Sequence, residues 1–134
     1  MKICSIGNSF SNDAHKWLHK LAKLNGFDIE TANLYIGGCS LETHWKNAKE
    51  NNAHYDFELN GNSGERKISI AEALELEKYD IVTLQQVSGL SGIYETYDRI
   101  CPRWRQLSET HSRMQNYTSI KHGLMKRTPL IATL

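Results

Sequence analysis

The sequence has little that would direct it to a membrane or to an oxidising compartment. No stretch of about 18 apolar residues occurs in its 134 residues, so no membrane span is expected. Residues 1–4 enter an apolar strand pattern directly, without the apolar core of a signal peptide. Cys4, Cys39 and Cys101 form no Cys-x-x-Cys pair, which favours buried or free thiols. We expect one cytoplasmic domain, short for a complete enzyme of the class considered below.

A serine lies where the first strand pattern ends. Residues 3–11 run from apolar positions into Gly7-Asn8-Ser9-Phe10-Ser11. We expect Gly7 to permit a sharp turn that presents Ser9 at the start of a helix, beside free backbone N–H groups that could stabilise an oxyanion. The simpler interpretation is that Ser9 only caps this helix.

Alternating strand and helix patterns follow. Residues 12–25 predict a helix capped by Asn12 and Asp13, in which apolar residues recur at helical spacing. These residues are Ala14, Trp17, Leu18, Leu21 and Leu24, and we expect Trp17, like Trp45, to contact the core or the sheet. Residues 27–35 predict the second strand.

The pattern continues to a third strand. Ser40 is expected to cap a helix that runs to Lys49, and residues 55–70 predict a hairpin or excursion. Ser69 and Glu72 form a capping box for a short helix, and residues 81–85 suit a buried parallel strand. This order predicts a doubly wound α/β sheet, in which ligands bind beyond the carboxyl ends of the strands.

Three segments carry a family resemblance: residues 6–11, residues 35–41 with Gly37-Gly38-Cys39-Ser40-Leu41, and residues 79–92 with Leu84-Gln85-Gln86-Val87-Ser88-Gly89. In this order they resemble the SGNH (GDSL-like) hydrolase superfamily, and a branch with Gly-Asn-Ser-Phe-Ser in place of Gly-Asp-Ser-Leu. The likeness covers residues 1–98. It implies the N-terminal half of a three-layer α/β/α, flavodoxin-like, doubly wound parallel sheet, here truncated.

The resemblance assigns roles to individual residues. Ser9 matches the nucleophile, and the backbone N–H groups of Ser9 and Gly38 match two oxyanion donors. The third donor in the superfamily is usually an asparagine side chain, and Gln85 or Gln86 stands at that place here. Asn8 stands where the superfamily usually has aspartate, and its amide could hold the turn.

The chain departs from the superfamily at the general base. That base comes from a late Asp-x-x-His, and no Asp-x-x-His occurs in this sequence. Without a base, a serine hydroxyl is a poor nucleophile at neutral pH.

The histidines present do not fill this gap. His15 and His19 could bind a metal at i, i+4 spacing, but no third ligand is evident, so we interpret them as solvated. We expect a structural or substrate-contact role for His44, and no metal or other cofactor. Ser88 and Ser91 could bound the pocket or form a plain turn.

Residues 99–134 differ in character from the rest of the chain. They hold seven Lys/Arg and one Asp/Glu, whereas residues 1–98 hold 9 and 14. The tail shows no sustained periodicity, so we expect it to be unstructured or non-native. Arg103-Trp104-Arg105 and Lys126-Arg127 could suggest a nucleic-acid patch, but no aromatic platform accompanies them, and no nucleic-acid partner is expected.

A frameshift near Asp98 is the sharper hypothesis for this tail. When each codon is read from its third base, residues 112–118 permit Pro-Asn-Ala-Lys-Leu-Tyr-Ile, and residues 119–128 permit His-Gln-Thr-Trp-Ala-Tyr-Glu-Thr-Asp. These strings look like the next strand and loop of the superfamily branch. Degenerate codons make some agreement certain, but the constraint is real at positions such as Met125, which before lysine can give only glutamate in the alternative frame. Coding DNA that lacks the alternative frame would refute the hypothesis.

The sequence thus predicts an SGNH-type serine esterase scaffold. The implied substrate is a small-molecule ester, with an acylated carbohydrate as one option. Because the base is missing, we expect no efficient catalysis by this chain and poor folding of the isolated protein. The alternatives are a non-catalytic binding module and a fragment that needs a second chain.

Overall fold

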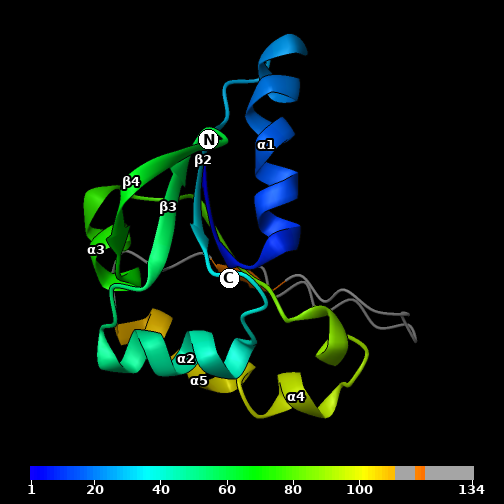
Figure 1. The fold of residues 1–134 in the computed structure, drawn as a ribbon, viewed down its shortest axis with the longest axis vertical. Coiled ribbons are helices and arrows are strands. Elements are labelled where there is room, and N and C mark those ends of the chain that lie inside the picture. Colours follow the sequence, from blue (N-terminus) through cyan, green and yellow to red (C-terminus); the bar gives the residue numbers. More distant parts are fainter. Residues whose placement is uncertain (111–116, 120–134) are drawn as a thin grey trace.

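One mixed sheet organises the chain. In the computed structural model, which describes residues 1–110 and 117–119, six strands follow the order β4-β3-β2-β1-β5-β6 (Figure 1). Four of them are parallel: β1 (Lys2–Gly7), β2 (Glu30–Tyr35), β5 (Ile81–Leu84) and β6 (Tyr117–Ser119). The α/β fold class is therefore confirmed.

An antiparallel hairpin extends the sheet beyond β2. It consists of β3 (Tyr55–Leu59) and β4 (Asn62–Ile68), where the sequence predicted a hairpin or excursion. Asn60 and Gly61 form its tight turn, both with positive φ. The turn lies against the first helix, because a Cβ on Gly61 would come within 2.7 Å of the His15 carbonyl oxygen.

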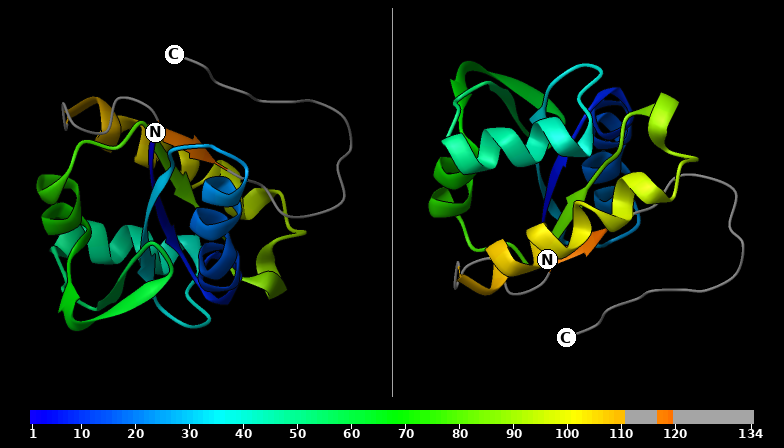
Figure 2. Two further views of the ribbon diagram at one scale, coloured as in Figure 1. Left: turned by 90° about the horizontal axis from the view of Figure 1, so that it is seen from above. Right: turned by 90° about the horizontal axis from the view of Figure 1, so that it is seen from below.

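Helices cover the two faces of the sheet unequally. Helix α1 (Ser9–Leu24) lies on one face, while α2 (Leu41–Glu50), α3 (Ile70–Leu76) and α5 (Cys101–Thr110) lie on the other (Figure 2). The apolar core lies on this second face. It joins strand residues such as Cys4, Ile6 and Leu84 to residues of α2 to α5, and it includes no residue of α1.

The predicted caps of the second and third helices are confirmed. The Ser40 hydroxyl accepts a hydrogen bond from the Thr43 N–H at the start of α2. Ser69 and Glu72 form both bonds of the capping box at α3. The buried parallel strand predicted at residues 81–85 is β5.

The first helix differs from its prediction in start, cap and orientation. It begins at Ser9 rather than residue 12, and the cap is Asn8 rather than Asn12 or Asp13. Trp17 was expected to contact the core or the sheet, but it is 58% exposed, and Leu24 near the end of the helix is 82% exposed. The predicted inward contact of Trp17 was wrong, and the buried positions of α1 are Ser11, His15 and Ala22.

The first part of the basic tail is folded. After the short helix α4 (Glu95–Asp98), α5 places Trp104 in the core with 1% of its surface exposed. The ring of Trp104 meets Trp45 of α2 edge-on at 5.7 Å. Residues 101–110 are therefore not unstructured, and the alternative expectation of a non-native tail stays a prediction. Lys126-Arg127, considered above as part of a nucleic-acid patch, lies outside the described residues.

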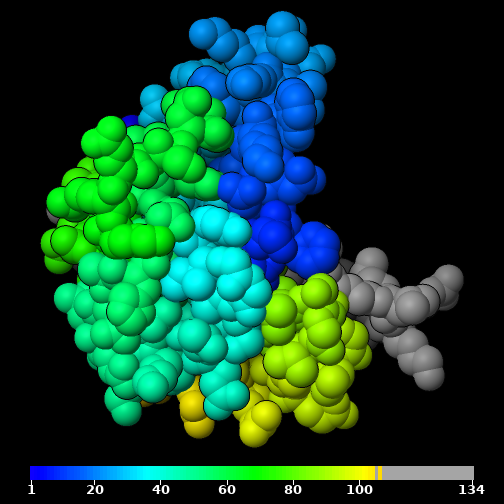
Figure 3. All heavy atoms as spheres, in the orientation of Figure 1, coloured from blue at the N-terminus to red at the C-terminus, as the bar shows by residue number. Residues whose placement is uncertain are grey.

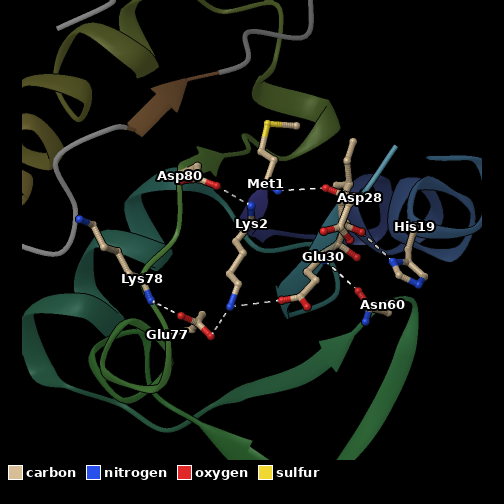
Figure 4. Close-up of polar contacts among 11 residues, drawn as sticks. Met1, Lys2, His19, Asp28, Glu30, Asn60, Glu77, Lys78 and Asp80 are labelled. Atoms are coloured by element: carbon tan, nitrogen blue, oxygen red, sulfur yellow. Dashed lines mark hydrogen bonds and ion pairs between the residues drawn. The ribbon is translucent and has the colours of Figure 1, made fainter. Parts of the chain in front are cut away.

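Charged contacts connect the amino ends of the parallel strands (Figure 4). The Lys2 ammonium group lies 2.6 Å from the Glu77 carboxylate and 3.4 Å from that of Glu30. The Lys2 backbone N–H donates to the Asp80 carboxylate at 2.7 Å. These contacts connect β1 to its two neighbours. No helix among the described residues is long and apolar enough to span a bilayer.

The buried Trp104 gives a direct test of α5. We expect Trp104→Ala to lower the free energy of unfolding by about 3–5 kcal/mol, because it empties a core position. The exposed Trp17 is the matched control, and Trp17→Ala should cost less than about 1 kcal/mol. Urea denaturation followed by circular dichroism measures both. Equal effects of the two substitutions would show that α5 does not pack as described.

Candidate active site at the carboxyl ends of the parallel strands

Three loops meet where the central parallel strands end. Strand β1 leads into Ser9, β2 leads into Gly38, and β5 leads into Gln85 and Gln86. Strand β1 pairs with both of the others, Gly7 lying beside Tyr35 and Ile6 beside Leu84. The residues that the sequence singled out at these three ends therefore belong to one edge of the sheet.

The side chain of Asn8 connects all three loops. It is 1% exposed, and its Oδ1 accepts the Phe10 N–H at 3.3 Å as the cap of α1. Its Nδ2 donates to the carbonyl oxygens of Cys39 and Gln86, each at 3.1 Å. Because every donor and acceptor of this buried amide is used, the three loops are held in one arrangement.

Gln85 reinforces the turn from the β5 side. Its Oε1 accepts hydrogen bonds from the backbone N–H groups of Asn8 at 3.1 Å and Ser11 at 3.0 Å. Since both partners are donors, the amide oxygen must face them, and this fixes the orientation of the amide group. Its Nε2 points away from these donors and has no hydrogen-bond partner within the described part of the chain.

The side-chain amide of Gln86 forms hydrogen bonds with α2 and with the loop after β5, and not with the turn at Ser9. Its side chain is buried, and its Oε1 accepts the N–H groups of Leu41 at 3.0 Å and Val87 at 2.9 Å. Its Nε2 donates to the Thr96 hydroxyl at 3.1 Å. Gln86 thus holds the start of α2 and the loop after β5, and both polar atoms of its buried amide have hydrogen-bond partners.

Two glycines shape the site for different reasons. Gly7 was expected to permit a sharp turn, but its φ is not positive. It is instead needed for close approach, because a Cβ there would lie 2.7 Å from Ser11 Cβ and 2.8 Å from Gln85 Oε1. Gly38 has a φ of 65°, which favours glycine, and a Cβ there would meet no atom within 4 Å.

Ser9 is exposed at the first turn of α1. The simpler interpretation, that Ser9 caps the helix, was wrong, because Asn8 is the cap. Neither the hydroxyl nor the N–H of Ser9 has a hydrogen-bond partner among residues 1–110 and 117–119. The hydroxyl therefore lies beside an unpaired N–H at the positive end of the helix dipole.

His44 lies beneath this site as a packed side chain. It is buried, its Nδ1 lies 2.9 Å from the Tyr55 hydroxyl and 3.4 Å from Cys39 Sγ, and its ring stacks on Tyr55. Burial lowers the pKa of His44 to about 3 and raises that of Cys39 to about 11. These contacts favour the structural one of the two roles predicted for His44.

A polar layer beneath α1 was missed by the sequence interpretation. His15, expected to be solvated, is buried, and its Nε2 lies 2.7 Å from the Ser5 hydroxyl. Beside it, Glu58 accepts hydrogen bonds from the amides of Asn33 at 2.6 Å and Asn12 at 2.5 Å. The polar positions Ser5 and Asn33 within otherwise apolar strands were the sequence feature that could have indicated this layer.

The described residues supply no base for Ser9. No imidazole or carboxylate in residues 1–110 or 117–119 forms a hydrogen bond with its hydroxyl. The same part of the chain contains no group of three His, Cys, Asp or Glu side chains that could hold a metal ion. Within the described part of the chain, the site therefore combines an exposed hydroxyl with unpaired N–H donors, but without a partner that would deprotonate the hydroxyl.

The fold and this edge of the sheet define an α/β protein with a serine-bearing turn at a topological switch point. The chain belongs to the DUF4886 family, described as a domain of unknown function, which matches residues 2–125. This match runs past Asp98, and the frameshift there stays a prediction. No curated protein matches the chain.

Two solved structures are similar to this chain. The crystal structure of a DUF4886 family protein from Bacteroides uniformis shares 38% identity over 80% of this chain, with a TM-score of 0.73. This chain covers only 43% of that protein's length. An acetyl xylan esterase, AlAXEase, shares 10% identity with a TM-score of 0.48, over 89% of this chain and 57% of the esterase.

Burial of His44 predicts a loss of stability in acid. In the unfolded chain this imidazole binds a proton below about pH 6.5, whereas in the folded chain it stays neutral down to about pH 3. The free energy of unfolding therefore falls as the pH drops from 6.5 toward 3. Between pH 7.5 and 5.0 the loss from this group should be about 2 kcal/mol. Burial also lowers the pKa of His15, which adds a loss of the same sign.

Urea denaturation at the two pH values tests this prediction. His44→Gln should reduce the acid-induced loss by about 2 kcal/mol, whatever its effect at pH 7.5. His54 is exposed, and His54→Gln serves as the control that should leave the loss unchanged. An unchanged loss in His44→Gln would mean that this imidazole is not buried in its neutral form.

Proposed function

We propose that this domain has the scaffold of an SGNH-type serine hydrolase that acts on esters, with Ser9 as the nucleophile. The proposal rests on one observation: Asn8, and not Ser9, caps the helix and makes the hydrogen bonds between the loops. Asn8 caps α1 and ties the three loops together, which leaves the Ser9 hydroxyl exposed and without a hydrogen bond to any described residue. A residue with no structural task at such a position is a candidate for chemistry.

The proposed oxyanion hole has three donors. Two are the backbone N–H groups of Ser9 and Gly38, at the ends of β1 and β2. The third is the Nε2 of Gln85, rather than of Gln86, whose amide is satisfied on both sides. Preorganised donors of this kind stabilise the negative charge that develops on a carbonyl oxygen, and each contributes roughly 3–4 kcal/mol.

The reaction follows from these roles. The Ser9 Oγ forms a bond to the ester carbonyl carbon while a base accepts its proton, and the three donors hold the resulting oxyanion. Collapse of this intermediate breaks the bond to the alcohol, which leaves with the proton, and water then releases the acid from Ser9. Because no Asp-x-x-His occurs in the sequence, we propose that this chain alone performs the first step only slowly.

The substrate class is an ester small enough to reach Ser9 at the rim of the sheet. An O-acetylated carbohydrate is the more specific proposal, based on the superfamily resemblance. None of the steps above uses a cofactor. The missing base favours a second candidate, a binding module that retains the oxyanion pocket without turnover.

A fluorophosphonate probe tests the nucleophile, because it phosphonylates an activated serine. We expect slow labelling that is abolished in Ser9→Ala and retained in Ser88→Ala, which removes another exposed serine at the same rim. Mass spectrometry of the labelled peptide reports the site. Labelling of Ser9 no faster than that of Ser88 would contradict its activation, and retained binding of an ester analogue would then favour the binding module.

A variant of Gln85 tests the third proposed oxyanion donor, its Nε2. Gln85→Glu keeps an oxygen for the N–H groups of Asn8 and Ser11 but replaces the Nε2 donor by a second oxygen. We expect it to slow labelling of Ser9 by roughly 100-fold or more, with the urea midpoint near that of the wild type. An unchanged labelling rate would exclude Gln85 as an oxyanion donor.

A further inference from the structure

The hydroxyl group of Tyr35 lies at the candidate site without a structural partner among the described residues. Tyr35 is the last residue of β2, and its side chain is half-buried. None of residues 1–110 and 117–119 forms a hydrogen bond with its hydroxyl. A tyrosine hydroxyl that is taken into a protein usually finds a hydrogen-bond partner there or on a bound molecule. The described part of the fold therefore leaves this polar group unused.

The ring of Tyr35 leans past the end of its strand. A Cβ at Gly37 would lie 3.2 Å from the Tyr35 hydroxyl oxygen. Gly37 follows Tyr35 by two residues, so the hydroxyl lies beyond the carboxyl end of β2, at the level of the loop that carries Gly38. Because Gly37 has no side chain, the hydroxyl occupies the space beside the proposed oxyanion donor.

Tyr35 lies on the face of the sheet that α1 covers. Side chains alternate along a strand, and those of Leu34 and Ile36 pack in or against the core on the other face. Asn33, two residues before Tyr35, belongs to the polar layer beneath α1, where its amide donates to Glu58. The phenol therefore extends from the same face as the first turn of α1.

The first turn of α1 is held close to this hydroxyl. In the parallel pair of β1 and β2, Tyr35 lies beside Gly7, two residues before Ser9. Asn12, three residues after Ser9, donates to Glu58 of β3, so the start of α1 lies over the β2–β3 side of the sheet. Figure 3 shows the loop after β2, in cyan, against the start of α1, in blue. Tyr35 thus lies on the side of Ser9 that faces the hairpin.

Gln85 lies on the other side of the same turn. The strands follow the order β2-β1-β5, so Tyr35 and Gln85 come from the two neighbours of the strand that leads to Ser9. A tetrahedral intermediate on a serine carries the oxyanion and, beside it, the oxygen of the leaving alcohol. The proposed oxyanion hole, with Gln85 as its third donor, takes the first of these oxygens. A donor on the opposite side of the turn is placed for the second.

We propose that Tyr35 is a further catalytic residue, whose hydroxyl donates a hydrogen bond to the alcohol oxygen of the ester. This inference rests on the proposed nucleophilic role of Ser9. The bond between the carbonyl carbon and the alcohol oxygen breaks, its electron pair stays on that oxygen, and the base delivers to it the proton taken from Ser9. Tyr35 keeps its own proton and stabilises the negative charge that builds up on the alcohol oxygen before delivery.

The effect of this hydrogen bond depends on the leaving group. A phenoxide keeps most of its charge on its oxygen, so it gains strongly from a donor placed there. A 4-nitrophenoxide spreads the charge into its nitro group and gains little. Two acetate esters that differ only in this group therefore separate help to the leaving alcohol from help to the oxyanion, which both esters need equally.

Acetylation of Ser9 by phenyl acetate and by 4-nitrophenyl acetate tests the proposal. Intact-mass spectrometry of the full chain measures the rate at which the acetyl group is attached, and peptide analysis locates it. Tyr35→Phe removes only the hydroxyl. We expect this variant to slow acetylation by phenyl acetate about tenfold, and acetylation by 4-nitrophenyl acetate less than about twofold.

The control is Tyr79→Phe, which removes the hydroxyl of a buried tyrosine before β5, at the opposite end of the sheet. It should leave both rates unchanged. Urea denaturation checks that the variants keep the fold. If Tyr35→Phe unfolds, Gly37→Ala replaces it, because its methyl group would lie 3.2 Å from the hydroxyl oxygen and displace it. Gly37→Ala should slow the reaction with phenyl acetate more than that with 4-nitrophenyl acetate.

Two results would overturn this inference alone. Equal slowing with both esters would place the Tyr35 hydroxyl at the oxyanion, and unchanged rates with both would make Tyr35 a packing residue at the rim. In either case, acetylation and fluorophosphonate labelling of Ser9 in the wild-type chain would leave the proposed function standing. A wild-type chain in which neither reagent modifies Ser9 would overturn the proposed function and this inference together.

Discussion

The whole site depends on one buried side-chain amide. Asn8 lies at the end of β1, and its single carboxamide accepts from the first turn of α1 while donating to the loops after β2 and β5. Aspartate could not make both donations, and alanine would leave two carbonyl oxygens without partners. Gln85 then holds the same turn from the other direction. Ser9 is exposed because Asn8 and Gln85 make the hydrogen bonds that hold this turn.

The sequence predicted the order of elements wherever local rules decide it. The capping box of Ser69 and Glu72, the Ser40 cap and the apolar run of β5 depend on nearby residues alone. It failed where tertiary contacts decide. Periodicity showed an apolar stripe on α1, but the sheet beneath α1 presents the polar side chains of Ser5, Asn33 and Glu58. The helix therefore turns His15 toward the sheet and leaves its apolar stripe exposed. The lack of pattern after residue 98 likewise concealed the burial of Trp104, which depends on its contact with Trp45.

The sequence predicted which loops form the candidate site, but it did not predict the hydrogen bonds of the individual side chains. The ends of three parallel strands must meet at one edge, so the neighbourhood of Ser9, Gly38 and Gln85 follows from topology. Which glutamine has a free donor depends on the direction of two amide groups, and no pattern encodes that. The two faces of the sheet are used differently, with an apolar core on one side and a polar layer beneath α1 on the other.

The central claim is that Asn8 fixes the three loops together. The free energy of unfolding of Asn8→Ala, measured by urea denaturation, tests it most directly, with Asn62→Ala at an exposed hairpin position as the control. The account predicts a loss of about 2–4 kcal/mol for Asn8→Ala, from a lost cap and two buried carbonyl groups without partners. The control should change by less than about 0.5 kcal/mol. Equal and small losses in both variants would contradict the account.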